Sequence, residues 1–375
     1  MKIGLFTDSY HPKINGVITS VDSLKFGLEQ LGHQVYIITG GQTKYPMKQN
    51  SILYLPSIDV PKWNLRVINP YISSNINAVR SLNLDIIHSH SELTIGLLAN
   101  KVAKDYGIYK CHTAHTFYHD YRHYAFNNFL HLGDMTEKFM VENFCNSNCD
   151  DLIVPSEKMY SYLMKDFSIQ KEPYIIKTGI YMPCSQKNQI TREKLGLSEQ
   201  DFILLYSGRL EKEKNIDFLI QCQKELNKID LNIKLLLVGD GTYTNYLQMV
   251  STNSKEIIML GKLPYDQMAY CYQLADLTVT ASTSETQGLS ILESLYNEIP
   301  VLCINDSAFD YIVRDNYNGY LIKDKMDYIN RALELKIDST KMNQLRENCK
   351  KDKREYSSVQ YAEEVEKVYQ KKLTF

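Results

Sequence analysis

Three features of the 375-residue sequence predict an α/β fold with two doubly wound, parallel-sheet domains. The chain is longer than the ~250–300 residues at which a single core stops growing. Short apolar runs alternate with helical patterns along nearly its whole length, which is typical of parallel sheets covered by helices on both faces. A polar stretch near the middle, 183–201, carries no strand pattern and is the expected linker.

The expected strands of the first half are short apolar runs that suit burial on both faces of a sheet. They cover 2–7, 34–39, 85–88, 110–113 and 152–154, with a helix over 17–31. The second half repeats this alternation more clearly. Its expected strands cover 202–207, 234–238, 257–260, 277–280 and 301–304, with helices over 216–226 and 244–250. Apolar residues at helical spacing predict a final helix over 357–373.

Composition and charge exclude several classes of protein. Apolar residues make up 44% and charged residues 23%, a globular balance. The net charge of −2 argues against nucleic acid as the main partner. No stretch approaches the ~18–20 apolar residues of a membrane span, and the chain reaches Asp8 too early for a signal peptide. The eight cysteines form no Cys-x-x-Cys pair, so we expect reduced thiols in a cytosolic protein.

The turn after the first expected strand is a candidate anion site. Gly16 stands immediately before the first helix, so backbone amides there could face an anion at the positive end of that helix. The turn lacks the Gly-x-Gly-x-x-Gly pattern, which disfavours an ordinary dinucleotide site. A plain turn glycine is the alternative interpretation.

Two cations follow the strand expected at 202–207. Arg209 and Lys214 come after its carboxyl end and near the start of the next helix. From there both could reach a diphosphate in a cleft between the domains. The alternative is that both are solvated charges balanced by Glu211 and Glu213.

The segment TASTSETQGLSILESLYNEIP is the most specific candidate. A strand ends near its start, a Ser/Thr-rich turn follows, and a helix begins near Gln287. Gly288 would let an anion approach the amides at this helix N-terminus, which continues into Leu289. Glu285 could hold a polar substrate, and Glu293 could accept two ribose hydroxyls as a bidentate carboxylate. The alternative is a capping Glu285 and an exposed Glu293.

The segment CHTAHTFYHDYRHY holds four histidines within twelve residues. The chain has no Asp-x-Asp triplet and no His-Glu-x-x-His pattern, so we expect no metal site. We expect instead that a histidine after the strand end, His115, acts by hydrogen bonding or charge stabilisation. An aromatic-rich acceptor wall would lie beside it, formed by Tyr118, Asp120, Tyr121 and His123.

These motifs together resemble the retaining glycosyltransferases of family 4, which have the GT-B fold. The resemblance covers essentially the whole chain and is strongest in FTDSYHPKINGV, HTFYHDYRHY, GRLEKEKNID and STSETQGLSILE. The spacing of Glu285 and Glu293 matches the paired-glutamate signature of the family. The run 284–288 resembles, more narrowly, the bacterial branch that glucosylates diacylglycerol. The chain departs from the family at Tyr296 and Glu298, where small residues are common.

The resemblance implies a division of labour between two domains. Residues 1–182 would bind the acceptor, residues 183–355 would bind the nucleotide sugar, and a helix over 356–375 would pack back on the first domain. Arg209 and Lys214 would bind the diphosphate, with amides at Gly16 closing over it. Glu285 would contact the donor hexose, and Glu293 the ribose. Gln287, Gly288 and Leu289 would add donor contacts, and His115 would line the acceptor side.

The resemblance also implies a chemistry. The reaction would retain the anomeric configuration without a metal or cofactor, and the leaving phosphate would take the acceptor proton, so that electrostatic stabilisation replaces a protein nucleophile. UDP-glucose and diacylglycerol would give an α-glucosyl glycolipid. The alternatives are a same-fold enzyme that extends a polysaccharide, teichoic acid or lipid-linked glycan, and a catalytically silent partner subunit.

A basic segment of the first domain predicts a cytoplasmic enzyme on the inner face of the cell membrane. The segment from Lys44 to Arg80 contains five basic residues and one acidic residue, which gives it a local charge of +4. Trp63, the only tryptophan, lies inside this segment with Tyr71 nearby. Basic residues next to amphipathic rings suit an anionic lipid surface. A solvated face with Trp63 in the core is the alternative. The basic residues are Lys44, Lys48, Lys62, Arg66 and Arg80, against Asp59.

Overall fold

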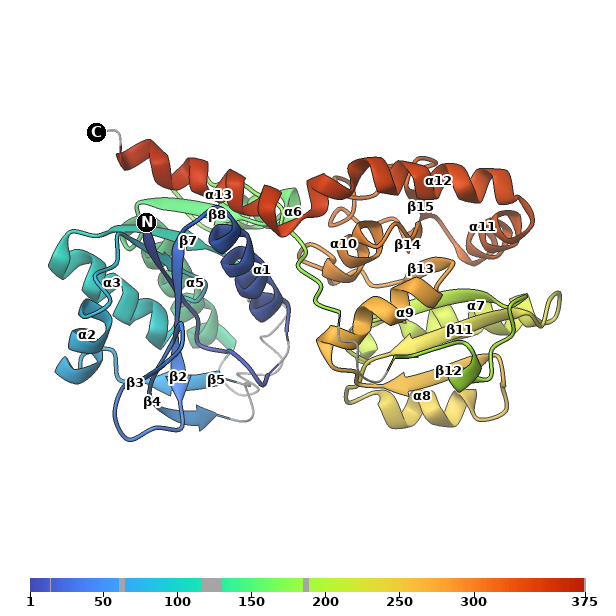
Figure 1. The fold of residues 1–375 in the computed structure, drawn as a ribbon, viewed down its shortest axis with the longest axis horizontal. Coiled ribbons are helices and arrows are strands. Elements are labelled where there is room, and N and C mark those ends of the chain that lie inside the picture. Colours follow the sequence, from blue (N-terminus) through green and yellow to red (C-terminus); the bar gives the residue numbers. More distant parts are fainter. Residues whose placement is uncertain (14, 61–64, 117–129, 185–188, 374–375) are drawn as a thin grey trace. The chain divides into compact units, whose positions relative to one another are not determined.

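The chain forms two compact units, each with its own parallel sheet (Figure 1). The structure, a computed structural model, describes residues 1–13, 15–60, 65–116, 130–184 and 189–373. The first unit combines Met1–Tyr181 with the C-terminal segment Ser358–Phe375, and the second unit is Met182–Ser357.

The first unit is a largely parallel sheet between helices. Its described strands follow the order β3-β4-β2-β1-β6-β7-β8-β9, with β5 antiparallel to β4 and β3 antiparallel to β4. Its strands are β1 Lys2–Phe6, β2 Gln34–Gly41, β3 Met47–Gln49, β4 Ile52–Val60, β5 Leu65–Ile68, β6 Ile86–Ser89, β7 Tyr109–Thr113, β8 Asp151–Val154 and β9 Tyr174–Ile175. Its helices are α1 Gly16–Gln30, α2 Ser73–Arg80, α3 Thr94–Tyr106, α5 Leu130–Ser147, α6 Glu157–Asp166 and α13 Ser358–Leu373.

Alternate residues of β1 serve the two faces of this sheet. Ile3 and Leu5 are buried in the core that α1 and α13 cover. Phe6 is buried in the opposite core, with residues of α2 and α3. Because side chains alternate along a strand, a continuous apolar run is required wherever helices cover both faces.

The second unit contains a fully parallel sheet in the order β12-β11-β10-β13-β14-β15. Its strands are β10 Phe202–Ser207, β11 Ile233–Val238, β12 Ile257–Gly261, β13 Leu277–Thr280, β14 Val301–Ile304 and β15 Gly319–Ile322. Its helices are α7 Ile216–Asn227, α8 Thr244–Ser251, α9 Met268–Leu274, α10 Leu289–Tyr296, α11 Lys325–Ile337 and α12 Ser339–Asp352. Single 3₁₀ turns are η2 Glu193–Leu195, η3 Lys212–Lys214, η4 Tyr265–Gln267 and η5 Lys353–Tyr356.

The predicted fold class is confirmed, and the strands expected from buried apolar runs lie within two residues of the observed ones. Five of the described strands were not anticipated. In the first sheet these are β4, its antiparallel partners β3 and β5, and the short edge strand β9, and β15 adds a sixth strand to the second sheet. β3 is only three residues long and exposed, so it carries no apolar pattern from which it could be recognised.

The strand order places one switch point in each sheet. The chain leaves β10 toward β11 on one side, and β13 then adds to the other side of β10. In the first sheet, β2 and β6 flank β1 in the same way. Loops that follow the carboxyl ends of such neighbouring strands diverge and leave a crevice, which is where doubly wound sheets bind ligands.

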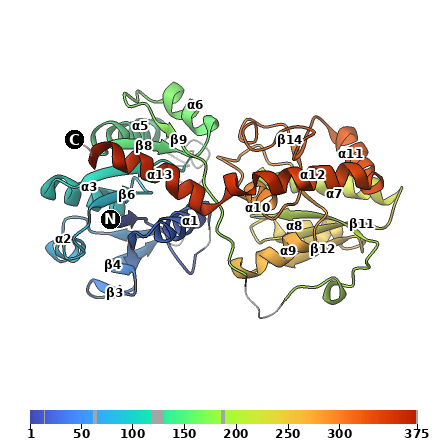
Figure 2. The same ribbon diagram turned by 45° about the horizontal axis from the view of Figure 1, so that its top comes forward.

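The C-terminal helix packs closely on α1, as Figure 2 shows. Gly27 makes this approach possible, because a Cβ atom there would lie 2.1 Å from the carbonyl oxygen of Ser358 and 2.7 Å from Cβ of Ala362. Tyr369, near the end of α13, is fully buried in the same core. The last helix is therefore part of the first unit.

We predict that Gly27→Ala destabilises the protein. In an exposed helix this change stabilises by roughly 0.5–1 kcal/mol, but here the added methyl group overlaps a backbone atom that cannot move freely, and overpacking costs about 1–3 kcal/mol. Thermal unfolding measures the change, with Lys25→Ala on the same helix as control. A higher melting temperature for Gly27→Ala would contradict the tight α1–α13 contact.

Candidate active site

Two loops meet at the switch point of the second sheet. The loop after β10 carries Arg209 and Lys214, and the loop after β13 carries the Ser/Thr-rich turn that leads into α10. The side-chain Nδ2 of Asn215 donates to the carbonyl oxygen of Ala281 at 3.4 Å, which links the two loops directly. The sheet topology thus brings together two motifs that lie about seventy residues apart in the sequence.

The centre of this arrangement is an ion pair between Lys214 and Glu285. Nζ of Lys214 lies 2.6 Å from Oε1 of Glu285 and also reaches Oγ of Ser284 at 3.4 Å and of Ser282 at 3.5 Å. The lysine side chain is only 9% exposed and that of the glutamate 24%. A buried ammonium group needs such partners because its desolvation is otherwise very costly.

The ion pair keeps Glu285 in its charged form. Burial acts to raise the pKa of this carboxyl group. The charge of Lys214 and hydrogen bonds from Lys214 and Ser282 outweigh that effect, so the pKa lies below its ordinary value. Glu285 is therefore a carboxylate at neutral pH, able to accept hydrogen bonds from hydroxyl groups.

Beyond Glu285 the chain turns sharply into α10. Gly288 precedes the helix with φ +77°, and a Cβ there would lie 2.5 Å from a ring carbon of Phe309. Leu289 is the first residue of α10, and the first amide groups of a helix have no partner within it. The side chain of Gln287 is 3% exposed, and its Nε2 has no hydrogen-bond partner among the residues described. The turn thus presents unpaired donors, which suits an anionic or hydroxyl-rich ligand.

Glu293 lies one turn and a half into α10 and is 8% exposed. The hydroxyl group of Tyr272, on α9, donates to its Oε2 at 2.8 Å and lies 2.7 Å from Oγ of Ser207 at the end of β10. Burial raises the pKa of Glu293 to about 7, although the hydrogen bond from Tyr272 opposes this. The exposed Glu293 of the alternative interpretation is therefore excluded.

Arg209 differs from Lys214 in its environment. Its side chain is 54% exposed, and its guanidinium group lies 3.4 Å from Glu213. Glu211 instead accepts a hydrogen bond from the backbone amide of Thr242 at 3.0 Å. The alternative interpretation, a solvated charge balanced by a neighbouring glutamate, thus describes Arg209. It does not describe Lys214, which is buried and pairs with Glu285 of another loop.

The first unit has its own polar cluster at the carboxyl edge of its sheet. Nε2 of His115, just beyond β7, lies 3.0 Å from Nδ1 of His90, just beyond β6. Burial lowers the pKa of His115 to about 4, so this ring is neutral at pH 7.

Gly16 is the first residue of α1. It follows Asn15, whose side chain caps the helix by accepting from the amide of Ile18 at 2.9 Å.

The four residues of the expected acceptor wall lie outside the described residues: Tyr118, Asp120, Tyr121 and His123. His112 is described, and both its ring nitrogens are engaged: Nε2 lies 3.1 Å from Glu92 and Nδ1 2.9 Å from Oγ of Ser89. Within the described ranges, no group of three or more His, Cys, Asp or Glu side chains could hold a metal ion.

Sequence analysis missed three residues of these sites. Tyr272 donates to Glu293, Ser207 contacts the hydroxyl group of Tyr272, and His90 contacts His115. Ser207 ends the strand that precedes Arg209, so its position at a strand end was a usable signal. Nothing in the sequence distinguishes Tyr272 from the other 27 tyrosines of the chain.

The departures at Tyr296 and Glu298 have a local structural explanation. Nζ of Lys353 lies 2.8 Å from Oε1 of Glu298 and 5.3 Å from the ring centre of Tyr296. Both larger side chains therefore pack with one lysine of η5, within the second unit. They do not interrupt the chain of contacts from Lys214 to Glu285.

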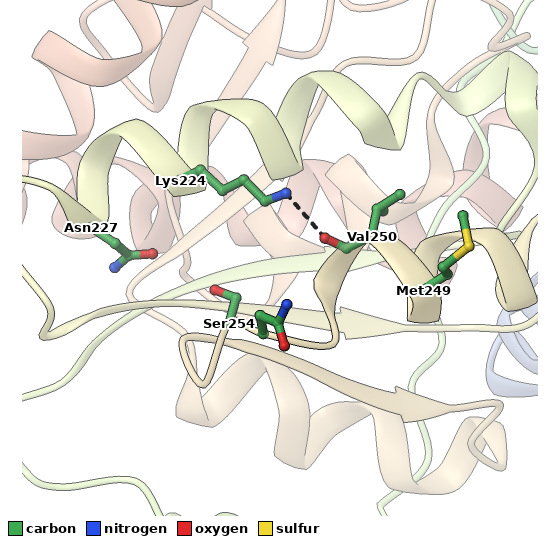
Figure 3. A pocket seen from close by; sticks show the side chains of 6 residues that line it. Lys224, Asn227, Met249, Val250 and Ser254 are labelled. Atoms are coloured by element: carbon green, nitrogen blue, oxygen red, sulfur yellow. Dashed lines mark hydrogen bonds between the residues drawn. The ribbon is translucent and has the colours of Figure 1, made fainter.

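A surface cavity of about 250 Å³ lies elsewhere on the second unit (Figure 3). Lys224, Asn227 and Ser254 are among its lining residues, and Nζ of Lys224 donates to the carbonyl oxygen of Val250 at 3.0 Å. Lys224 and Asn227 lie at the end of α7 and Ser254 follows α8, whereas Lys214 precedes the start of α7. A helix of twelve residues spans about 18 Å, so this cavity lies toward the opposite edge of the sheet from Lys214.

Across the described ranges, no helix is both long and apolar enough to cross a membrane. The longest described helix of the first unit, α5, contains Glu142 and Lys138 as an ion pair at 3.7 Å.

Comparisons with known proteins agree with this architecture. The model of "Glycosyltransferase Family 4" matches residues 14–181, and that of "Glycosyl transferases group 1" matches residues 187–356. The chain is 30% identical to alpha-monoglucosyldiacylglycerol synthase of Acholeplasma laidlawii, over 98% of this chain and 96% of that protein. It is 33% identical to the Streptococcus pneumoniae protein of the same name, over 92% of this chain and 80% of that protein.

A solved structure gives the same fold. Anabaena HepE in complex with UDP and glucose superposes with a TM-score of 0.75 over 99% of this chain and 100% of that one, at 16% identity. At that identity the likeness speaks for the fold alone. The full-length relatives, the two family models and the two parallel-sheet units agree, and the chain belongs to the family 4 glycosyltransferases of the GT-B fold.

Proposed function

We propose that this enzyme transfers glucose from UDP-glucose to diacylglycerol at the membrane surface, with retention, to give an α-glucosyl glycolipid. The observation that best supports binding of the UDP-glucose donor is the buried Lys214–Glu285 pair at the switch point of the second sheet. The two relatives of 30% and 33% identity, both named as alpha-monoglucosyldiacylglycerol synthases, support the sugar and the acceptor.

In this proposal the second unit binds the donor. Lys214 and Arg209 neutralise the diphosphate, Arg209 from an exposed and adjustable position and Lys214 from a buried one. Glu285 holds Lys214 while the site is empty and accepts hydroxyl groups of the hexose when the donor is bound. The amides at Leu289 and the side chain of Gln287 add donors beside it. Preorganised donors of this kind stabilise the charge that develops on the leaving diphosphate.

Glu293 binds the ribose in the same proposal. Tyr272 holds one carboxylate oxygen at 2.8 Å, which fixes the orientation of the group before the nucleotide arrives. A bound carboxylate can accept two hydroxyl groups at once. The leaving phosphate takes the acceptor proton, so neither glutamate acts as a nucleophile and no metal ion is needed.

The first unit binds the acceptor in this proposal. His115 lies near the reacting carbon and the Gly16 amides at the diphosphate, and the acceptor side is formed by Tyr118, Asp120, Tyr121 and His123.

The exposed sheet edge at β3 supports the proposed contact of the first unit with anionic lipid on the cytoplasmic side of the membrane. Tyr45 is 78% exposed and Met47 46%, and both lie between the exposed Lys44 and Lys48 beside the edge strand β3. Such a mixture of apolar and basic side chains suits a charged interface.

Three residues of the basic segment do not support this contact. Arg66 donates to the carbonyl oxygen of Gly40 at 2.9 Å and lies 3.2 Å from Asp59, so its charge is already used within the first unit. Lys62 and Trp63 lie outside the described residues. The proposed membrane contact therefore rests on the segment from Lys44 to Lys48.

Replacing the diphosphate cation should stop turnover without unfolding the protein. We expect Lys214→Ala to lose about 10²–10³ in kcat, the scale of removing one preorganised donor, and Arg209→Ala to lose less because its side chain is exposed. Lys212→Ala, on the same 3₁₀ turn, is the matched control. Full activity in a folded Lys214→Ala protein would contradict the proposal that Lys214 neutralises the diphosphate.

Glu293→Gln should weaken nucleotide binding while stabilising the empty protein at high pH. Because burial raises the pKa of Glu293 to about 7, its contribution to stability is fully present below pH 4.5 and is lost as the pH rises through 7. Relative to wild type, the variant should gain up to about 3 kcal/mol between pH 4.5 and 8. Loss of charged hydrogen bonds to ribose should weaken UDP binding about 10–100-fold.

Thermal unfolding over this pH range and calorimetric titration with UDP measure the two effects separately. The matched control is Glu347→Gln, an exposed glutamate on α12. Unchanged UDP affinity would contradict the proposal that Glu293 binds the ribose. A stability difference between variant and wild type that does not depend on pH would contradict the raised pKa of buried Glu293.

The acceptor is tested with radiolabelled UDP-glucose and vesicles of diacylglycerol with or without anionic lipid. We expect label in the organic extract, more of it with anionic vesicles, and a loss of that excess in 1 M salt, where the Debye length falls to ~3 Å. Charge reversal at Lys44 and Lys48 should remove the excess, and the same change at Lys350 and Lys351 of α12 should not. Label in soluble glycan alone would favour the polysaccharide or teichoic acid alternative.

A further inference from the structure

We propose that His90 is a positioning residue that sets the tautomer of His115: Nδ1–H of His90 donates to Nε2 of His115, and His115 therefore presents Nδ1–H as a hydrogen-bond donor to its ligand. The role of His115 at the acceptor side rests on the proposed function, whereas its tautomer does not.

The contact itself is short and well oriented. Nδ1 of His90 and Nε2 of His115 lie 3.0 Å apart, with the ring centres 5.3 Å apart and the ring planes 24° from parallel. His90 is 3% exposed and His115 is partly exposed. The buried ring can therefore act on the ring that a ligand can reach.

The other nitrogen of His90 decides which ring donates. Nε2 of His90 is buried and has no hydrogen-bond partner among the described residues. A neutral imidazole carries its single proton on one nitrogen, and buried N–H groups without an acceptor are rarer than buried acceptors without a donor. The proton of His90 therefore lies on Nδ1, where it has an acceptor in His115.

Both rings are neutral in this environment. Burial lowers the pKa of His90 well below its ordinary value, and the nearby rings of His88 and His115 lower it further. Burial lowers the pKa of His115 to about 4 in the same way, against the opposing charge of Glu92. Two neutral rings that share one hydrogen bond must adopt complementary tautomers, because one has to donate and the other to accept.

A further contact fixes the orientation of His90. His88 stacks on it with the ring centres 4.2 Å apart. Both nitrogens of His88 are in turn held, Nδ1 by the hydroxyl of Tyr369 at 2.6 Å and Nε2 by that of Thr113 at 2.7 Å. The C-terminal helix thus supports the pair through Tyr369, which explains why α13 has a polar atom buried beneath this sheet.

The chemical consequence concerns what His115 can bind. Its Nδ1 forms no hydrogen bond with any described residue, and it carries the proton. It can therefore donate to an oxygen lone pair of a hydroxyl or ester group, and it cannot accept a proton at that atom. His115 thus orients an oxygen of the substrate and is not the base of the reaction.

The tautomer is read by NMR of protein labelled with ¹⁵N-histidine at pH 7.5, with His115 assigned from the signals lost in His115→Asn. We expect a protonated, pyrrole-like Nδ1 and a pyridine-like Nε2 for His115 in the wild type and in His90→Asn, whose amide places an N–H where Nδ1 was. In His90→Leu we expect the Nε2–H form to appear. A protonated Nε2 in the wild type, or no change in His90→Leu, would overturn the proposal.

Turnover provides a second readout. His115→Asn keeps an N–H near the position of Nδ1, whereas His115→Gln places one near that of Nε2, so we expect the former to be about 10-fold more active, the scale of one hydrogen bond. UDP affinity should be unchanged in both, because His115 is not among the proposed nucleotide contacts. Greater activity of His115→Gln would contradict the assignment. Loss of all glycosyl transfer to lipid would refute the proposed function, while the NMR result would still decide the tautomer.

Discussion

The buried charge of Lys214 is the constraint on which the second unit depends. An ammonium group that is 9% exposed requires a countercharge, and Glu285 supplies it at 2.6 Å. The two residues can meet only if the loops after β10 and β13 leave neighbouring strands at the same edge of the sheet. The parallel, doubly wound topology provides that geometry, and the edge at which the two loops leave the sheet is where we propose that the donor binds.

The neighbouring groups gain their properties from the same packing. Gly288 adopts a left-handed conformation against the ring of Phe309, and α10 starts directly after it at Leu289. Further along α10, burial raises the pKa of Glu293, and Tyr272 holds its carboxyl group in place. Burial of the Glu293 carboxyl group therefore disfavours its charged form in the empty protein. Binding sites commonly sacrifice stability in this way for function.

The fold class and most strands could be predicted because strands buried on both faces are recorded in the sequence as short apolar runs. Lys214, Glu285 and Glu293 could be named as candidate site residues because their motifs follow such runs in the sequence, and their role stays a prediction. That Lys214 and Glu285 pair with one another was not predictable from either motif, since the contact depends on the order of strands in the sheet. Tyr272 escaped notice for a related reason: its hydroxyl group matters only because α9 packs beside α10's carboxylate. The tautomer of His115 depends similarly on a ring from the adjacent strand end.

The central claim is that the Lys214–Glu285 pair is the donor site in its empty form. A crystal structure with UDP-glucose, or with UDP and glucose, tests this most directly. The account predicts a phosphate oxygen within hydrogen-bond distance of Nζ of Lys214, a hexose hydroxyl on Glu285, and both ribose hydroxyls on Glu293. A nucleotide bound elsewhere, with Lys214 still paired to Glu285 alone, would contradict it.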